Sequence, residues 1–314
     1  MACVLTLTMN PTIDLSTSVD CVEPTRKLRC TIARREPGGG GINVARVVSR
    51  LGSDVAAVYP AGGVTGQLLR QLVDREDITS VMAPVAGETR ENFTASEITT
   101  GQQYRFVLAG PLLSEPEWLR CLEVLAAQSG RPDLIVASGS LPPGVPDDFY
   151  GRIAKIARDR GIRMALDASG PALKAALNHH VYLVKPNLRE LRELTGAPLV
   201  DRASQIAACR TLVSDRKAQA VALTLGEQGA LLITDKGEWR AKPLAVKSVS
   251  AVGAGDSFLG GMVWALASGR AMEVAFKYGV AAGSAAVSSP GTELCQASDV
   301  RHLVEHVSVE ETNE

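Results

Sequence analysis

Gly253-Ala254-Gly255-Asp256-Ser257 stands directly before a stretch of small and apolar residues, 258–265, with the composition of a buried helix. Glycines just before a helix let backbone N–H groups turn towards one point, and the positive end of the helix dipole favours an anion there. A carboxylate at Asp256 would repel that anion, unless it takes the proton from a hydroxyl that attacks a phosphoryl group. An ordinary helix cap has the same residue types, so this segment alone leaves both interpretations open.

A second glycine-rich segment, Gly38-Gly39-Gly40-Gly41, leads into a predicted helix that begins Ile42-Asn43-Val44. Four consecutive glycines carry no side chains, so a ligand can approach their backbone closely. The amide of Asn43 can donate to and accept from sugar hydroxyls. The position directly before a helix favours a ligand-binding loop over a flexible turn.

The composition predicts a folded globular protein. The 314 residues are 46% hydrophobic and 21% charged, with a formal net charge of -1 and no basic run, which argues against nucleic acid or an anionic membrane as a partner. No apolar run is long enough to span a bilayer, and residues 1–10 are expected to form a strand, not a signal peptide. The six cysteines are scattered without a C-x-x-C pair, which favours reduced thiols and a cytoplasmic location.

Strand-like and helix-like segments alternate along the chain. Apolar runs at 4–7, 55–59, 134–137, 164–166, 182–184 and 220–224 are separated by helix-length segments such as 148–160, 188–195 and 203–214. This alternation predicts a single Rossmann-like α/β domain over residues 1–314, with a central, mostly parallel sheet and helices on both faces. Folds of this kind bind their ligands at the turns that follow the strands.

Two segments, about 15–35 and 88–108, depart from this pattern because polar and apolar residues alternate in them. In the second, Thr99-Thr100-Gly101-Gln102 lies between two strand-like runs and predicts a β-hairpin. We expect both segments to form a small antiparallel sheet that stands off the domain as a lid or a dimer surface.

A nucleotide site needs other residues, because the chain has neither a G-x-x-x-x-G-K-[ST] loop nor a G-x-G-x-x-G turn after a strand. Lys185-Pro186-Asn187 ends a predicted strand and opens a helix that contains Glu190. The oxygens of Asn187 and Glu190 suit Mg²⁺, directly or through water, although Glu190 in a first helical turn is also compatible with a simple helix start. Thr224 and Gly226 lie in a second strand-end turn, which is either a phosphate contact or an ordinary β-turn.

Cations gather in the two lid segments. Lys27 and Arg29 lie in the first and Arg90 in the second, where they could bind a phosphate remote from the nucleotide or merely keep a sheet edge solvated. Asp14, near the first strand, is an acceptor for sugar hydroxyls or a turn residue.

Together these segments resemble the PfkB, or ribokinase-like, family of sugar kinases. The resemblance covers nearly the whole chain, from Asn10-Pro11-Thr12-Ile13-Asp14 to the region 284–295, and its two specific signatures are 38–46 and 252–257. Lys27-Leu28-Arg29-Cys30 and the all-glycine loop are most similar to the minor bacterial 6-phosphofructokinase type. Related 1-phosphofructokinases and tagatose-6-phosphate kinases usually carry a lysine at the position of Gly40.

The resemblance implies a role for each matching residue. Asp256 would be the catalytic base, and the anion hole would consist of the N–H groups of Gly253, Ala254, Gly255 and Asp256. Mg²⁺ would be organised by Asn187 and Glu190, and the co-substrate ATP would be bound by Lys185, Asn187, Thr224 and Gly226. The sugar would be held by Asp14, Gly39, Asn43 and Ser140, and its 6-phosphate by Lys27, Arg29 and Arg90. In a homodimer formed through the lids, Lys27 would reach the neighbouring subunit's site.

Members of this family often bind a monovalent cation beside the anion hole, mainly through backbone carbonyls. The matching positions are Ser250, Val252, Ala286, Ser289, Gly291 and Glu293. Close relatives tend to have Asn and Arg in place of Ser289 and Glu293, but ligation by carbonyls depends little on the side chain. The resemblance therefore also implies a K⁺ site.

The leading hypothesis is an ATP-dependent 6-phosphofructokinase that converts fructose 6-phosphate to fructose 1,6-bisphosphate in glycolysis. Within the same chemistry, the alternatives are a 1-phosphofructokinase and a tagatose-6-phosphate kinase. Outside it, the alternative is a catalytically silent sugar-phosphate sensor. Asp256 argues against the sensor, because a binding module gains nothing from a carboxylate that faces a phosphate.

Overall fold

A large sheet forms the centre of the computed structural model, which describes residues 4–128, 131–289 and 293–312. Its strand order is β14-β13-β12-β11-β10-β9-β8-β1-β4-β5. The neighbours from β11 to β5 are all parallel, as predicted for a chain of alternating strands and helices. They are β1 (Val4–Leu7), β4 (Val55–Ala61), β5 (Thr79–Pro84), β8 (Leu134–Ser138), β9 (Arg163–Asp167), β10 (Val181–Val184) and β11 (Ala218–Thr224). The antiparallel strands β12 (Ala230–Thr234), β13 (Glu238–Ala241) and β14 (Val309–Glu311) extend the sheet beyond β11.

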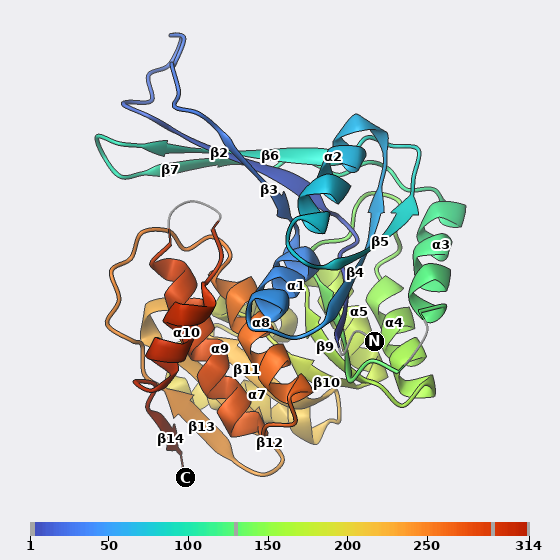
Figure 1. Cartoon of the computed structure of the whole chain (residues 1–314). Coiled ribbons are helices and arrows are strands. Elements are labelled where there is room, and N and C mark those ends of the chain that lie inside the picture. Colours follow the sequence, from blue (N-terminus) through green and yellow to red (C-terminus); the bar gives the residue numbers. More distant parts are fainter. Residues whose placement is uncertain (1–3, 129–130, 290–292, 313–314) are drawn as a thin grey trace.

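Helices cover both faces of this sheet (Figure 1). One face carries α1 (Gly40–Arg50), α2 (Gly63–Asp74), α8 (Ala254–Ala267), α9 (Met272–Val287) and α10 (Ala297–Val304), and the other carries α3 (Glu115–Ala126), α4 (Phe149–Asp159), α5 (Gly170–Ala176), α6 (Leu188–Thr195) and α7 (Arg202–Ser214). Successive strand residues serve opposite faces: on β8, Leu134 and Val136 join one core, and Ile135 and Ala137 the other. The strands and helices predicted from the sequence are therefore confirmed.

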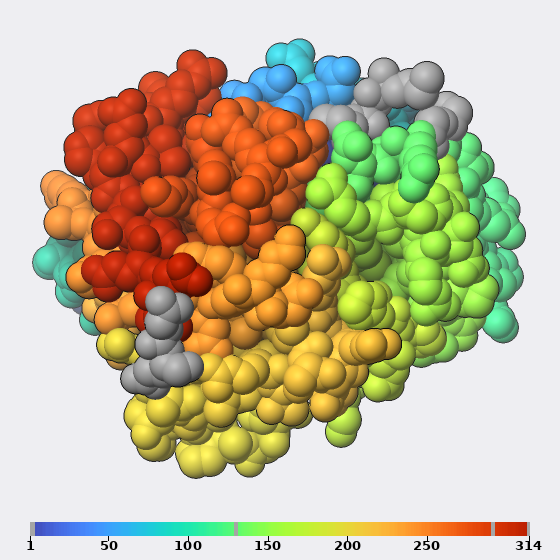
Figure 2. Space-filling view, turned by 90° about the horizontal axis from the view of Figure 1, so that it is seen from below, coloured from blue at the N-terminus to red at the C-terminus, as the bar shows by residue number. Residues whose placement is uncertain are grey.

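The side of this body that faces away from the lid is a continuous packed surface (Figure 2). Within the described residues, no helix has both the length and the apolar character needed to cross a membrane. The five described cysteines are free thiols, as expected.

A second, four-stranded sheet stands off the body as the predicted lid (Figure 1). It consists of β2 (Thr12–Val19), β3 (Arg34–Gly38), β6 (Arg90–Glu97) and β7 (Gln103–Phe106), in the order β3-β2-β6-β7. The pairs β2–β3 and β6–β7 are antiparallel, and the hairpin at 98–102 is confirmed. The central pair β2–β6 is parallel. The reason is topological: β2 and β6 follow β1 and β5, which belong to the parallel part of the large sheet, so both strands leave the body in the same direction.

The first lid segment is less regular than its sequence suggested. Between β2 and β3, residues 20–33 form a long, mostly exposed excursion that carries Lys27 and Arg29. The carboxylate of Glu97 anchors its base, since Glu97 Oε1 accepts a 2.8 Å hydrogen bond from the backbone N–H of Val22. The two cations are therefore placed on a projection of the lid and outside its strands.

Candidate active site

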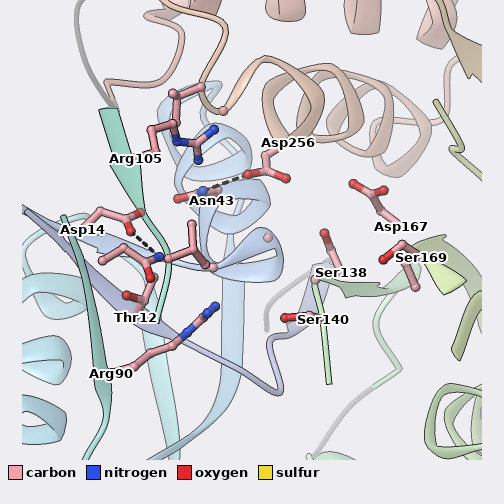
Figure 3. Close-up of a pocket in the computed structure, with 18 of the residues that line it drawn as sticks. Thr12, Asp14, Asn43, Arg90, Arg105, Ser138, Ser140, Asp167, Ser169 and Asp256 are labelled. Carbon is pink, nitrogen blue, oxygen red and sulfur yellow. Dashed lines mark hydrogen bonds between the residues drawn. The ribbon is translucent and has the colours of Figure 1, made fainter. Parts of the chain in front are cut away.

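A cavity of about 300 Å³ lies where the lid meets the carboxyl edge of the large sheet (Figure 3). The strands β8 and β9 end at it, α1 and α8 begin at it, and lid strands β2, β6 and β7 cover it. This is the edge at which α/β folds bind ligands. The predicted residues that line it are Asp14, Gly39, Asn43, Arg90, Ser140, Glu190, Val252, Gly253 and Asp256.

The two glycine-rich signatures meet in this cavity. Gly253 is the N-cap of α8 and has a φ of 74°, a conformation that glycine adopts without strain. A Cβ there would also lie 2.5 Å from Leu294 Cδ2. Asp256 lies in the first turn of α8, and its Oδ2 accepts a 2.8 Å hydrogen bond from Nδ2 of Asn43 on α1 (Figure 3). The contact orients the carboxylate towards the cavity.

The pKa of Asp256 is raised to about 7. Burial is the main cause and the nearby charge of Asp167 adds to it, while the Asn43 hydrogen bond and the charge of Lys185 act in the opposite direction. A carboxylate with a pKa near neutrality is suited to accept a proton from a hydroxyl at physiological pH.

Asp167, at the end of β9, is a site residue that the sequence analysis missed. It lines the cavity, and its Oδ2 lies 3.1 Å from Nζ of the buried Lys185. Although burial opposes its charge, Asp167 and Asp256 hold the pKa of Lys185 above its ordinary value. Lys185, predicted to bind ATP, is thus a charged partner of Asp167 beneath the start of α8. A signal for Asp167 existed: it is an acid directly after the predicted strand 164–166.

Asn187 and Glu190 form a reciprocal cap at the start of α6. Asn187 Oδ1 accepts from the Glu190 N–H, and Glu190 Oε2 accepts from the Asn187 N–H, both at 2.9 Å. Glu190 also lines the cavity, where burial and the charge of Asp167 raise its pKa. The capping role is therefore observed, and the second oxygen of this carboxylate, Oε1, lies 3.7 Å from Nη2 of the exposed Arg189.

The donor set at this place fits Mg²⁺. Two carboxylates, from Asp167 and Glu190, line the same cavity, and hard oxygen ligands with several retained waters are typical of this ion. The described residues contain no group of three or more His, Cys, Asp or Glu side chains arranged around one point. A bound Mg²⁺ would therefore rely on water and on phosphate oxygens for the rest of its coordination.

The remaining nucleotide candidates lie beside Asn187 and outside the lining of this cavity. Thr224, at the end of β11, pairs with Asn187 in an isolated parallel bridge, and its N–H donates to the carbonyl of Pro186 at 3.0 Å. Gly226 has a φ of 58° and begins a short 3₁₀ helix, Gly226–Gln228, with open space around its Cα. These residues form an accessible surface next to the cavity.

The cationic side chains predicted to bind the sugar's phosphate divide into one that lines the cavity and two that do not. Arg90 lines the cavity and donates to the carbonyls of Leu108 and Asn10, both at 2.8 Å, while its Nε has no protein partner among the described residues. Arg105 of β7 also lines the cavity and was missed, because nothing distinguished it from other lid charges. Lys27 and Arg29 do not line the cavity of their own chain.

The sugar-side candidates are polar and partly buried. Asp14 Oδ1 accepts a 3.0 Å hydrogen bond from Asn92 of β6, which the sequence analysis also missed (Figure 3). Burial raises the pKa of Asp14, opposed by Asn92 and by the charges of Arg90 and Arg105. Ser140 Oγ accepts from Asn10 Nδ2 at 3.2 Å.

Four of the positions predicted to bind a monovalent cation lie on two segments that contact each other. They are Ser250, Val252, Ala286 and Ser289. The N–H groups of Val249 and Ser250 both donate to the carbonyl of Val287, at 2.9 and 3.1 Å, which places 249–252 against the end of α9, where Ala286 and Ser289 are. Glu293 turns towards the lid, since its carboxylate lies 3.4 Å from Arg34 of β3. Gly291 lies outside the described residues.

Residues 2–299 match the family described as pfkB family carbohydrate kinase. The chain belongs to the PfkB family. The ribokinase-like fold and the phosphotransferase class expected from the sequence are thereby confirmed.

Two PfkB-family relatives carry the name ATP-dependent 6-phosphofructokinase isozyme 2. The Mycobacterium tuberculosis (strain H37Rv) protein is 43% identical over 302 residues, which cover 96% of this chain and 89% of the relative. The Escherichia coli (strain K12) protein is 40% identical over 310 residues, covering 98% and 100%. A crystal structure of phosphofructokinase-2 from Escherichia coli in complex with potassium superposes with a TM-score of 0.93 at 39% identity, covering 98% of this chain and 99% of that one.

Proposed function

We propose that this PfkB-family chain is an ATP-dependent 6-phosphofructokinase, which transfers the γ-phosphoryl group of ATP to the 1-hydroxyl of fructose 6-phosphate. The observation that carries the proposal is the carboxylate of Asp256, held by Asn43 at the N-terminus of α8 with a pKa near 7. The names of the two relatives, at 40% and 43% identity over nearly the whole chain, support the substrate.

The sugar phosphate would lie across the cavity, with its phosphate near Arg90 and its 1-hydroxyl near Asp256. These two residues lie on opposite sides of the cavity in Figure 3, and Asp14 and Asn43 lie between them. Asp256 would accept the hydroxyl proton as the oxygen attacks. The N–H groups at the start of α8 would stabilise the charge on the migrating phosphoryl group.

ATP would occupy the open surface beside Asn187, Thr224 and Gly226 and direct its terminal phosphate towards α8. Lys185 would act from beneath the anion hole, where its charge lies close to Asp167 and Asp256. When bound, Mg²⁺ would neutralise phosphate charge, and Glu190 with Asp167 would hold it, in part through water. Carbonyl groups of 250–252 and 286–289 would hold K⁺, supported by the potassium complex of the Escherichia coli protein.

The Gly40 position favours a 6-phosphate over a 1-phosphate substrate. The lysine that related 1-phosphofructokinases usually carry at this position would not fit here without a change in the loop. A Cβ on Gly40 would lie 2.2 Å from Ser138 Oγ and 3.0 Å from the backbone of 138–139. A structure of phosphofructokinase-2 from Escherichia coli in complex with fructose-6-phosphate, at a TM-score of 0.91, also supports this choice. Tagatose 6-phosphate has the same phosphate position and remains the alternative sugar.

We also propose a homodimer through the lids in the cytoplasm. The lid exposes large apolar side chains at Ile32, Ile98, Phe106 and Val107, and Ile32 is 96% exposed. Pairing these surfaces would bring Lys27 and Arg29 of one chain towards its partner. One structure of the Escherichia coli protein is described as a tetrameric inhibited form, so a tetramer is the competing state. Sedimentation with and without MgATP would distinguish the two.

Release of ADP tests the proposed reaction. At fixed MgATP, kcat/KM should be highest for fructose 6-phosphate, lower for tagatose 6-phosphate and lowest for fructose 1-phosphate. A highest value for fructose 1-phosphate would show that the lid arginines have been assigned the wrong phosphate. No ADP release with any of these sugars would overturn the proposal.

A further inference from the structure

Four charged side chains form a continuous run of ion pairs behind the active site. Arg46 of α1 is 2% exposed, and it lies 3.0 Å from Glu36 of β3 and 2.8 Å from Glu76, which follows α2. Glu76 is also 3.1 Å from Arg50, one turn further along α1. Arg46 Nη1 donates to the carbonyl of Pro37 as well, at 3.2 Å. We refer to Glu36–Arg46–Glu76–Arg50 as the charge ladder.

One end of the charge ladder contacts the segment that packs against the anion hole. Arg50 Nη1 lies 3.4 Å from the carbonyl oxygens of both Leu294 and Cys295. The side chain of Leu294 packs so closely on Gly253 that a Cβ there would be 2.5 Å away. Arg50 thus holds the segment against which the first turn of α8 is packed.

The other end lies beside Asp14, on the sugar side of the cavity. Glu36 is the direct cross-strand partner of Asp14, the residue proposed to bind sugar hydroxyls. Strand β3 then runs straight into Gly39 and α1, so its position fixes the glycine loop as well. A separate ion pair between Arg34 of β3 and Glu293 also joins β3 to the segment that contains Leu294.

Each charge in the charge ladder depends on the presence of its partners. A buried guanidinium must have nearly all its donors satisfied, and removal of one partner leaves a charge without compensation. Although burial opposes it, Arg46 and Arg50 keep the pKa of Glu76 below its ordinary value, so this carboxylate stays ionised. Two planar guanidinium groups fix the position of the Glu76 carboxylate in a way that a single lysine contact would not.

We propose that the charge ladder positions the sugar-binding strand relative to the anion hole. None of its members lines the cavity, so it acts through Asp14 at one end and Gly253 at the other. The two ends therefore make separable contributions: Arg50 governs the rate of phosphoryl transfer, and Glu36 governs the affinity for the sugar phosphate. The inference rests on the proposed kinase function.

Arg50→Gln and Glu36→Gln test the two ends in the full-length protein. Arg50→Gln should lower kcat roughly tenfold or more, because small displacements at a reacting centre are costly, with the sugar KM within about twofold of wild type. Glu36→Gln should raise the sugar KM several-fold and leave kcat near wild type. Arg50→Lys should recover part of the kcat. Arg70→Gln, which removes an exposed ion pair with Asp74 on α2, is the matched control and should leave both parameters unchanged.

Hydrogen exchange gives a readout that needs no turnover. In Arg50→Gln, amides of 253–257 should exchange faster than in wild type, while those of the distant strand β12 should not. Equal kinetic effects of Arg50→Gln and Arg70→Gln, or a uniform rise in exchange over the whole protein, would overturn the positioning role. A wild-type protein that releases no ADP with any sugar phosphate would instead contradict the proposed function, while the exchange result would still decide whether Arg50 braces 253–257.

Discussion

Replacing Asp256 with asparagine should abolish turnover and at the same time stabilise the fold at alkaline pH. The folded-state pKa of Asp256 is about 7, against an ordinary value of 3.8, a difference of about three units. Because the folded protein binds this proton more tightly than the unfolded chain, the favourable contribution is lost as the pH rises from about 4 to 7. Above pH 7 the ionised carboxylate costs folding free energy, which an uncharged amide avoids.

The size of the effect follows from the shift. Each pKa unit corresponds to about 1.4 kcal/mol, so three units set a ceiling of about 4 kcal/mol at pH 8. Asp256 is only half-buried beside an open cavity, and solvent screening reduces this value. We expect Asp256→Asn to gain roughly 1–3 kcal/mol relative to wild type between pH 5 and pH 8.

Chemical denaturation of both proteins at pH 5 and pH 8 measures this difference, since titrating groups that do not interact with Asp256 contribute equally to both and cancel. Turnover in the same preparations should fall by roughly 10²–10⁴-fold. A variant that is no more stable than wild type at pH 8 would refute the argument that burial and Asp167 disfavour the charge. A variant that retains more than about a tenth of kcat would refute the base assignment.

Three further predictions test neighbouring residues. Glu190→Gln should shift the activity curve to higher Mg²⁺ concentration, because an amide is a poorer ligand for a hard cation; an unchanged curve would leave Glu190 with its capping role alone. Arg90→Ala should raise KM for the sugar phosphate with little change in KM for ATP, at a cost on the order of 1.5–3 kcal/mol, and equal losses towards both substrates would indicate a damaged lid. In wild type, kcat/KM for the sugar should decline as the pH falls below about 7, the pKa of Asp256, and a profile flat down to pH 5 would contradict that value.

Much of the fold could be predicted because its signals are local. Apolar runs and helix-length segments mark the strands and helices, and Thr99 to Gln102 marks the lid hairpin. The parallel pairing of β2 with β6 could not be predicted in this way, since it depends on where β1 and β5 lie in the large sheet. The excursion at 20–33 also went unpredicted, because its polar and apolar alternation is the same as that of a strand.

The candidate site was predicted best where backbone conformation needs special residues. Gly253 and the glycines before α1 stand out in the sequence, and the residues that follow them, Asn43 and Asp256, were found with them. Asp167 and Arg105 come from a regular strand end and a lid strand, where acids and arginines are common for unrelated reasons. Only the folded arrangement, in which Asp167 meets Lys185 at 3.1 Å, reveals that it belongs to the site.

The arrangement of charge in the cavity determines which end of a sugar phosphate can react. Asp256 and Asp167 lie on the side where α8 begins, and their mutual repulsion already raises the pKa of Asp256. A phosphate dianion placed there would add to this repulsion, whereas near Arg90 it would meet a guanidinium whose Nε has no partner among the residues that the structure describes. In the proposed reaction, the substrate's own phosphate would therefore bind on the Arg90 side and a hydroxyl on the Asp256 side. The phosphoryl group transferred from ATP would instead be stabilised by the positive N-terminus of α8, so this end of the cavity would disfavour the sugar's phosphate and still accept the phosphoryl group of ATP.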